Sequence, residues 1–217
     1  IGILSGDILM IYAYSLLEGL ELKIYRKILK RFNEISIMVC EGQQLDMDYE
    51  RKDLISEGDY IEMIKLKTAV LIGFSLEQGG IVADESKSTT KKLYDIGEMM
   101  GIGFQLMDDY LDVFGSPGFG KTIGGDIIAN KKTYLMVKLM EKSDEKDLKK
   151  IKKLKKSKNE KEKIKIVSEL MTKYDINTLA KNTIEDYFKT ALSQLEEIKS
   201  ESKYKVILKE YFDEMMV

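Results

Sequence analysis

The residue types best suited to chemistry are three aspartates and a glutamine that fall within eight consecutive positions. With Asp108 at 0°, a helical pitch of about 100° per residue places Asp112 at about 40° and Asp109 at about 100°. Gln105 falls between them, opposite an apolar face that includes Phe104 and must be buried. Carboxylates this close repel one another unless a cation offsets the repulsion. Mg²⁺ suits such a face because it prefers oxygen ligands, whereas the alternative is a solvated acidic face.

A glycine-rich stretch follows these aspartates and brings residues suited to phosphate. Residues 115–125 contain five of the 16 glycines and the single proline, Pro117. Glycine permits close backbone approach, and lysines such as Lys121 and Lys131 carry a compact charge that suits phosphate. Acidic metal ligands, glycines and lysines in this order predict a site for a metal-bridged diphosphate. The stretch lacks the GxxxxGK[ST] spacing of an ATP-binding P-loop.

The composition excludes several other kinds of site. The 217 residues include no histidine and one cysteine, so imidazole-activated nucleophiles, histidine metal sites, disulfides within the chain and CxxC pairs are all excluded. The net charge of −2 gives no general case for a nucleic-acid partner. No apolar run is long enough to span a membrane. The lone cysteine fits a reducing compartment and, on an apolar helix, we expect Cys40 in the core.

The elements that position these residues are predicted to be long helices. A single proline and a dominant helical periodicity favour an all-α fold, and no strand-like alternation occurs. We expect one domain over residues 1–217. The expected helices are 8–32, 61–77 and 91–114, with a turn at 53–59, a kink or end at Gly79–Gly80, a helix-capping region at 86–90, an irregular stretch at 115–125 and further helix after 131.

Residues 142–165 form a separate lysine-rich segment. Twelve lysines against five acidic residues give it a local charge of +7. We interpret it as a solvated surface helix, with Leu148, Ile151 and Leu154 as a narrow apolar stripe. The alternative is a patch for nucleic acid or an anionic membrane. The absence of aromatic residues weakens the nucleic-acid alternative.

Four motifs in order resemble the trans-type isoprenyl diphosphate synthases, the polyprenyl synthetases. None would suffice alone, but together they cover nearly the whole chain. They are Ile3-Leu4-Ser5-Gly6-Asp7, Gly42-Gln43-x-Leu45-Asp46, Lys67-Thr68, and Phe104-Gln105-x-x-Asp108-Asp109-x-Leu111-Asp112 followed by Gly120-Lys121, Gly125-Asp126 and Asn130-Lys131.

The resemblance implies an antiparallel helical bundle around a central cavity. It implies a cytoplasmic, homodimeric prenyltransferase in which Mg²⁺ bridges the diphosphate of an allylic substrate, isopentenyl diphosphate adds to it, and diphosphate is released. By position, the metal ligands would be Asp108, Asp109 and Asp112. The catalytic set would be Asp108, Asp109, Lys67 and Lys121; Lys67, Lys121 and Lys131 would contact diphosphate, Thr68 and Gln105 would support them, and Gln43 and Asp46 would line the site.

The resemblance also sets an expectation about residues that precede this chain. The chain begins at Ile1 without an initiator methionine, and we expect the family's first Asp-rich motif, with the arginines that follow it, upstream of that residue. Without that motif, two alternatives stay open. One is a non-catalytic partner subunit of a prenyl synthase, and the other is a terpene cyclase of the same fold that uses a single prenyl substrate.

Overall fold

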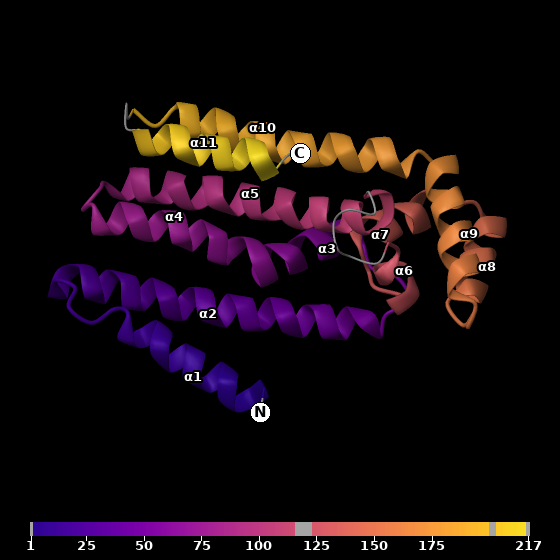
Figure 1. The fold of residues 1–217 in the computed structure, drawn as a ribbon, viewed down its shortest axis with the longest axis horizontal. Helices are drawn as coiled ribbons and strands as arrows, with labels where there is room; N and C mark the ends of the chain where they lie inside the picture. The colour runs from indigo at the N-terminus through magenta and orange to yellow at the C-terminus, as the bar shows by residue number, and fades with distance from the viewer. Residues whose placement is uncertain (1, 116–122, 200–202, 216–217) are drawn as a thin grey trace.

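The computed structural model describes residues 2–115, 123–199 and 203–215, which contain helices and no strand (Figure 1). The all-α prediction is therefore confirmed. The elements are α1 (Gly2–Ser15), α2 (Leu22–Glu50), α3 (Glu57–Ile64), the π-helical η1 (Lys65–Ala69), α4 (Val70–Val82), α5 (Lys87–Phe114), α6 (Gly125–Ala129), α7 (Tyr134–Lys142), α8 (Glu145–Leu154), α9 (Glu160–Lys173), α10 (Ile176–Glu196) and α11 (Lys203–Met215).

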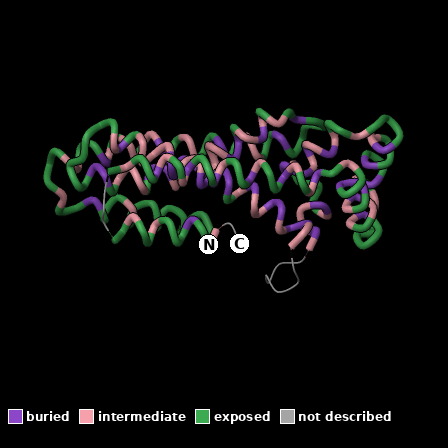
Figure 2. The backbone as a smooth tube through the Cα atoms, turned by 90° about the horizontal axis from the view of Figure 1, so that it is seen from above, coloured by how far each residue is buried: buried purple, intermediate pink, exposed green. Residues whose placement is uncertain are grey.

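Helix α5 lies at the centre of the bundle, packed against α4 on one side and α10 on the other (Figure 1). Helices α2, α4, α5 and α10 run side by side in alternating directions, and α6 to α9 gather at one end. Ile96, Met100 and Leu106 are fully buried on α5 and belong to the larger of two apolar clusters. A smaller cluster between α2 and α4 includes Ile28, Ile35 and Phe74. Buried residues recur along the long axis of the bundle (Figure 2).

The predicted helix over residues 8–32 is wrong, because the chain turns between α1 and α2. Gly19 lies in this turn with a φ of 84°, a left-handed conformation that glycine adopts without strain. The apolar periodicity runs through the turn unbroken, so it gave no sign of the break. In the described part of α1 no residue is buried, although Leu4 and Ile11 are apolar.

Other predicted boundaries hold more closely. Ser86 caps α5 by accepting the backbone N–H of Thr89, inside the predicted capping region. Gly79 and Gly80 do not end α4, since the helix continues to Val82. Cys40 is exposed, so its predicted core position is wrong. The buried residues of α2 recur every seven positions from Ile28 to Tyr49, and Cys40 lies off that stripe.

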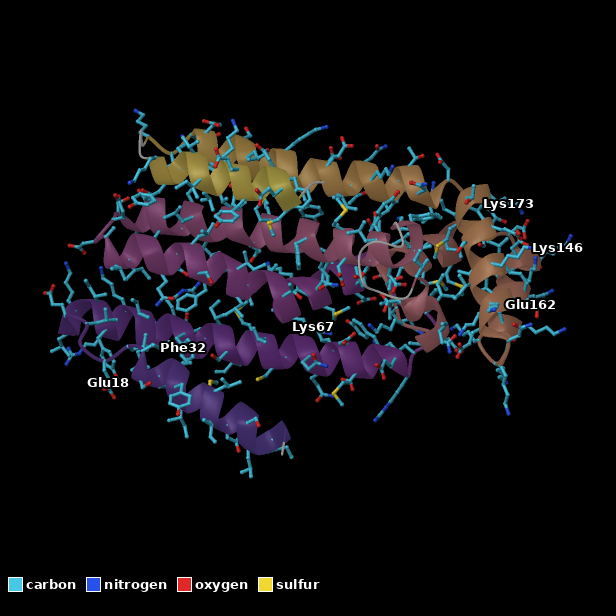
Figure 3. The ribbon with its side chains drawn as sticks, viewed as in Figure 1. Glu18, Phe32, Lys67, Lys146, Glu162 and Lys173 are labelled. Carbon is cyan, nitrogen blue, oxygen red and sulfur yellow. The ribbon has the colours of Figure 1, made fainter. Side chains whose placement is uncertain are left out.

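Two glycines hold the π-helical segment that carries Lys67. A Cβ atom on Gly42 of α2 would overlap the backbone of Leu66 and Lys67. A Cβ on Gly101 of α5 would lie 2.5 Å from the Cα of Ala69. Both helices therefore approach η1 at backbone distance, from two sides. Single π-helical turns inside α-helices are frequent at functional sites, and this one presents Lys67 between α2 and α4 (Figure 3).

Replacing Gly42 by alanine is expected to destabilise the fold by about 1–3 kcal/mol, because the added methyl group displaces backbone rather than a flexible side chain. Thermal unfolding of the variant measures this. Gly79→Ala is the matched control, since a Cβ there meets nothing within 4 Å and α4 should gain up to about 1 kcal/mol of helix propensity. Equal unfolding temperatures for the two variants would refute the close packing of α2 on η1.

Candidate active site

A polar cavity of about 120 Å³ opens beside the aspartates of α5. It lies among the C-terminal half of α2, α3 with η1, the C-terminal half of α5, and α6 with the segment that follows it. Five carboxylates and three lysines line it, so it suits a ligand that combines anionic groups with cations. The lining residues are Asp46, Glu50, Tyr60, Met63, Ile64, Lys67, Gln105, Asp108, Asp109, Asp126, Lys131, Lys132 and Thr133.

Asp109 is a buried anchor for three elements. Its side chain is 4% exposed and one carboxylate oxygen accepts both the hydroxyl of Tyr60 on α3 and the backbone N–H of Tyr134, at 2.9 Å, where α7 begins. The amide of Gln105 donates to the other oxygen at 3.4 Å. Burial raises the pKa of Asp109 to about 7, although these hydrogen bonds oppose the shift. Burial likewise raises the pKa of Tyr60.

The free energy of unfolding is expected to fall as pH rises from 3.8 to above about 7, because of Asp109. Its pKa is about 7 in the folded protein against 3.8 as the ordinary value, so folding favours the protonated carboxyl. That contribution is fully present below pH 3.8 and is lost as pH rises through about 7, by at most about 4 kcal/mol.

Denaturant unfolding of wild type and Asp109→Asn between these pH values, with a chelator present, measures the effect. Asparagine keeps an oxygen that can accept from Tyr60 and Tyr134 but does not ionise, so the variant should lose most of this slope. Parallel pH profiles for the two proteins would show that Asp109 is not the group responsible.

Asp112 attaches the start of α6 to α5. Its carboxylate accepts the backbone N–H of Asp126 at 3.1 Å, and its main-chain oxygen accepts the N–H of Gly124 at 2.6 Å. Gly124 has a φ of 80°, which glycine adopts without strain and which lets the chain turn into α6. Asp112 is 8% exposed, so it is neither solvated nor open to the cavity in the way that Asp108 is.

Asp108 is the only one of the three aspartates that is half-buried rather than buried, and it lines the cavity. Its neighbour Gln105 is held from η1, where the hydroxyl of Thr68 donates to the amide oxygen at 3.2 Å. The structure thus joins two residues that were predicted separately as supports for the diphosphate site. Phe104 is 42% exposed, so its predicted burial on the opposite face is wrong. The neighbouring Leu106 on that face is fully buried, as expected.

Each of two cavity lysines lies against a carboxylate. The Nζ of Lys67 is 2.5 Å from Oδ2 of Asp46, and the Nζ of Lys131 is 2.7 Å from Oδ1 of Asp126. The hydrogen bond to Asp126 raises the pKa of Lys131, which therefore stays charged. A third lysine, Lys132, also lines the cavity, and burial lowers its pKa. The site thus presents fixed positive charge next to the aspartates.

Among the described residues, three predicted site residues do not line the cavity: Gln43, Thr68 and Asp112. Gln43 is exposed on α2 and is not among the residues that line the cavity. Lys121 lies outside the described residues. Seven residues that line the cavity were not predicted as site residues from the sequence, and they include Lys132 and Tyr60. Tyr60 had a usable signal, because it precedes Lys67 by seven positions, which is two helical turns.

The three aspartates do not form a complete metal site by themselves. Within the described ranges, no three acidic, cysteine or histidine side chains are grouped to hold a metal ion. The reason is that Asp109 and Asp112 are buried and bind backbone N–H groups. Asp108 with its oxygen-rich surroundings still fits Mg²⁺, which binds through one or two carboxylates and completes its shell with water and substrate phosphates.

Comparisons with known proteins show which proteins this chain is similar to. A family model described as polyprenyl synthetase matches residues 1–171. The geranylgeranyl diphosphate synthase of Sulfolobus acidocaldarius is 32% identical over 209 residues, which cover 93% of this chain and 63% of that protein. The geranylgeranyl pyrophosphate synthetase structure from Pyrococcus horikoshii Ot3 superposes with a TM-score of 0.92 at 30% identity, covering 99% of this chain and 66% of that one.

A third relative was crystallised with ligands. The geranylgeranyl pyrophosphate synthase from Corynebacterium glutamicum, complexed with isoprenyl diphosphate and magnesium, has a TM-score of 0.88 at 25% identity, covering 99% of this chain and 62% of that one. The chain spans 46% of one curated relative's length and 63% of another's.

Proposed function

Because this chain belongs to the polyprenyl synthetase family, we propose that the complete protein is a magnesium-dependent prenyltransferase. It condenses isopentenyl diphosphate with an allylic prenyl diphosphate and releases diphosphate. The observation that carries the proposal is that Asp108, Lys67 and Lys131 line the same cavity. The relative that was crystallised with isoprenyl diphosphate and magnesium supports the choice of ligand and metal.

The chain's residues divide the work between binding and shielding. Lys67 and Lys131 bind the allylic diphosphate, and Asp108 would hold the magnesium ion that accompanies it. Bound magnesium supplies the charge that stabilises diphosphate as it leaves. Met63 and Ile64 form an apolar wall beside these groups, which keeps water from the allylic cation. Released diphosphate serves as the base for the final proton, so the absence of histidine is no obstacle.

The proposal is tested by incubating the complete protein with an allylic diphosphate, isopentenyl diphosphate and magnesium. One diphosphate should be released for each five-carbon unit added to the product. Release from the allylic substrate alone, with no elongated product, would favour the terpene cyclase instead. No turnover by the isolated protein, with activity only beside a second chain, would favour the non-catalytic partner subunit.

We also propose that the protein is a homodimer in the cytoplasm. The exposed helix α1 supports the proposal of a dimer. Leu4, Leu9 and Ile11 are each more than 60% exposed on this helix. Exposed apolar residues on more than one side of a helix mark it as an interaction site. No helix in the described part of the chain has the length and apolar character needed to cross a bilayer.

Introducing charge on α1 is expected to weaken the dimer. Ile11→Glu buries a carboxylate in the proposed interface and should shift the protein toward monomer at micromolar concentration, as measured by sedimentation velocity. Val206→Glu on α11, also exposed, is the control and should leave the dimer unchanged. A wild-type monomer, or a dimer that tolerates both variants, rules out this interface.

A further inference from the structure

The lysines of α8 form one continuous basic face. Ile151 and Leu154 are buried on the side of α8 that packs against the bundle. At about 100° per residue, six exposed lysines span an arc of about 160° on the opposite side. We call them the α8 basic face: Lys146, Lys149, Lys150, Lys152 and Lys153 on α8, with Lys156 in the turn that follows it.

The charge of the α8 basic face is not neutralised by its neighbours. None of the six lysines has a carboxylate within ion-pair distance in the ranges that the structure describes, whereas Lys165 and Lys189 elsewhere on the surface pair along their own helices. Of the neighbouring acidic residues, Asp144 and Asp147 are engaged by Lys173 of α9 at 3.7 and 2.5 Å. The exposed Glu145, next to Lys146 in the chain, is the one carboxylate within the arc of the face, so the six lysines keep a large excess of positive charge. The face therefore presents a concentrated positive charge to the solvent.

The position of the face limits what can bind it. Helices α8 and α9 occupy one end of the elongated bundle, and Lys146 lies at the outer edge of that end (Figures 1 and 3). Residues 142–165 carry +7 while the whole chain carries −2, so the remainder carries −9. A flat anionic surface can meet this end alone, whereas a long polyanion would extend onto the acidic remainder.

We propose that the α8 basic face docks the protein, reversibly and by charge, onto a bilayer containing anionic phospholipids. Lysine clusters on an amphipathic helix bind such surfaces, each lysine contributing about 1 kcal/mol, or about fivefold in partitioning. Residues 142–165 contain no aromatic residue and no arginine, so they lack groups that stack on bases or grip phosphates in pairs. The apolar side of α8 packs within the protein, so the attachment is electrostatic rather than inserted.

The attachment does not depend on the proposed reaction. If that function is correct, a product with a long hydrocarbon chain leaves the enzyme next to the phase that dissolves it, and this consequence alone rests on the proposed function. The binding itself is measured without substrate. A failure of the vesicle experiment and a failure of the product assay therefore stay distinguishable.

The test is co-sedimentation of the complete protein with vesicles of phosphatidylcholine, alone or mixed with phosphatidylglycerol. Binding is expected only to the mixed vesicles and should be lost near 1 M salt, where charges are screened beyond about 3 Å. The triple variant Lys146→Gln, Lys149→Gln, Lys153→Gln should partition about 100-fold more weakly. Its prenyl-transfer activity in solution should match wild type, which shows that it is folded.

A matched triple variant controls for the loss of charge itself. Lys87→Gln, Lys181→Gln and Lys199→Gln remove three exposed lysines outside the face and should bind the mixed vesicles as wild type does. Equal losses in the two triple variants overturn the proposal. So does the absence of binding at low salt, or tighter binding to RNA or duplex DNA than to mixed vesicles.

Discussion

Replacing Asp108 by asparagine is expected to lower kcat/KM for the allylic substrate by about 100- to 1,000-fold, a loss typical of removing one group that stabilises developing charge. Of the three clustered aspartates, Asp108 is the one that both lines the cavity and keeps part of its surface exposed. Asparagine has nearly the same shape but cannot supply a carboxylate to a metal. The loss should therefore come without a change in unfolding temperature.

Two other aspartate variants serve as controls for this prediction. Asp48→Asn changes an exposed carboxylate on α2 that accepts a hydrogen bond from Gln44 at 2.9 Å, and it should keep near-normal turnover. Asp109→Asn should flatten the pH dependence of the free energy of unfolding. It should not mimic Asp108→Asn, because the Asp109 carboxylate is buried and binds Tyr60 and Tyr134. Near-normal turnover in Asp108→Asn would remove Asp108 from the proposed metal side of the site.

Replacing Lys67 by methionine is expected to reduce kcat/KM by about 100-fold. Methionine preserves most of the length and the apolar stem but removes the charge that lies 2.5 Å from Asp46. Because Lys67 contacts the diphosphate both before and during its departure in our account, KM should rise and kcat should fall together. Lys67→Arg should recover only part of the loss, since a planar guanidinium does not replace a compact ammonium at this position.

The same π-helical segment supplies the control. Lys65 lies two residues earlier, pairs with Glu98 at 3.3 Å and does not line the cavity. Lys65→Met therefore tests whether removing any lysine from η1 is enough to disturb the site. An equal loss of activity in Lys65→Met and Lys67→Met would mean that the segment's integrity, and not the charge of Lys67, sets the rate.

The helical wheel predicted the acidic face of α5 but not how its members differ. Asp108, Asp109 and Asp112 are the same residue type and lie within one arc of about 100°. What separates them is the tertiary packing of other elements, because Asp109 binds Tyr134 at the start of α7 and Asp112 binds Asp126 in the first turn of α6. No local pattern on α5 carries that information, so the prediction of three metal ligands could not distinguish anchors from a cavity residue.

Irregular backbone segments likewise depend on tertiary packing that local sequence patterns do not reveal. The capping of α5 by Ser86 is a local preference and was predictable. The π-helical turn that carries Lys67 depends on Gly42 of α2, which lies 25 residues earlier in the chain. The break between α1 and α2 was hidden because apolar residues continue through it. Local preferences therefore predicted helices and caps, whereas long-range packing determined the geometry at the site.

The central claim is that the cavity beside α5 holds a metal-bridged diphosphate. Titrating wild-type protein with an unreactive allylic diphosphate analogue, with magnesium and then with a chelator, tests it most directly. We predict binding that requires magnesium and that is weakened in both Asp108→Asn and Lys67→Met. Binding that is equally tight without magnesium, or that both variants leave unchanged, would contradict the account.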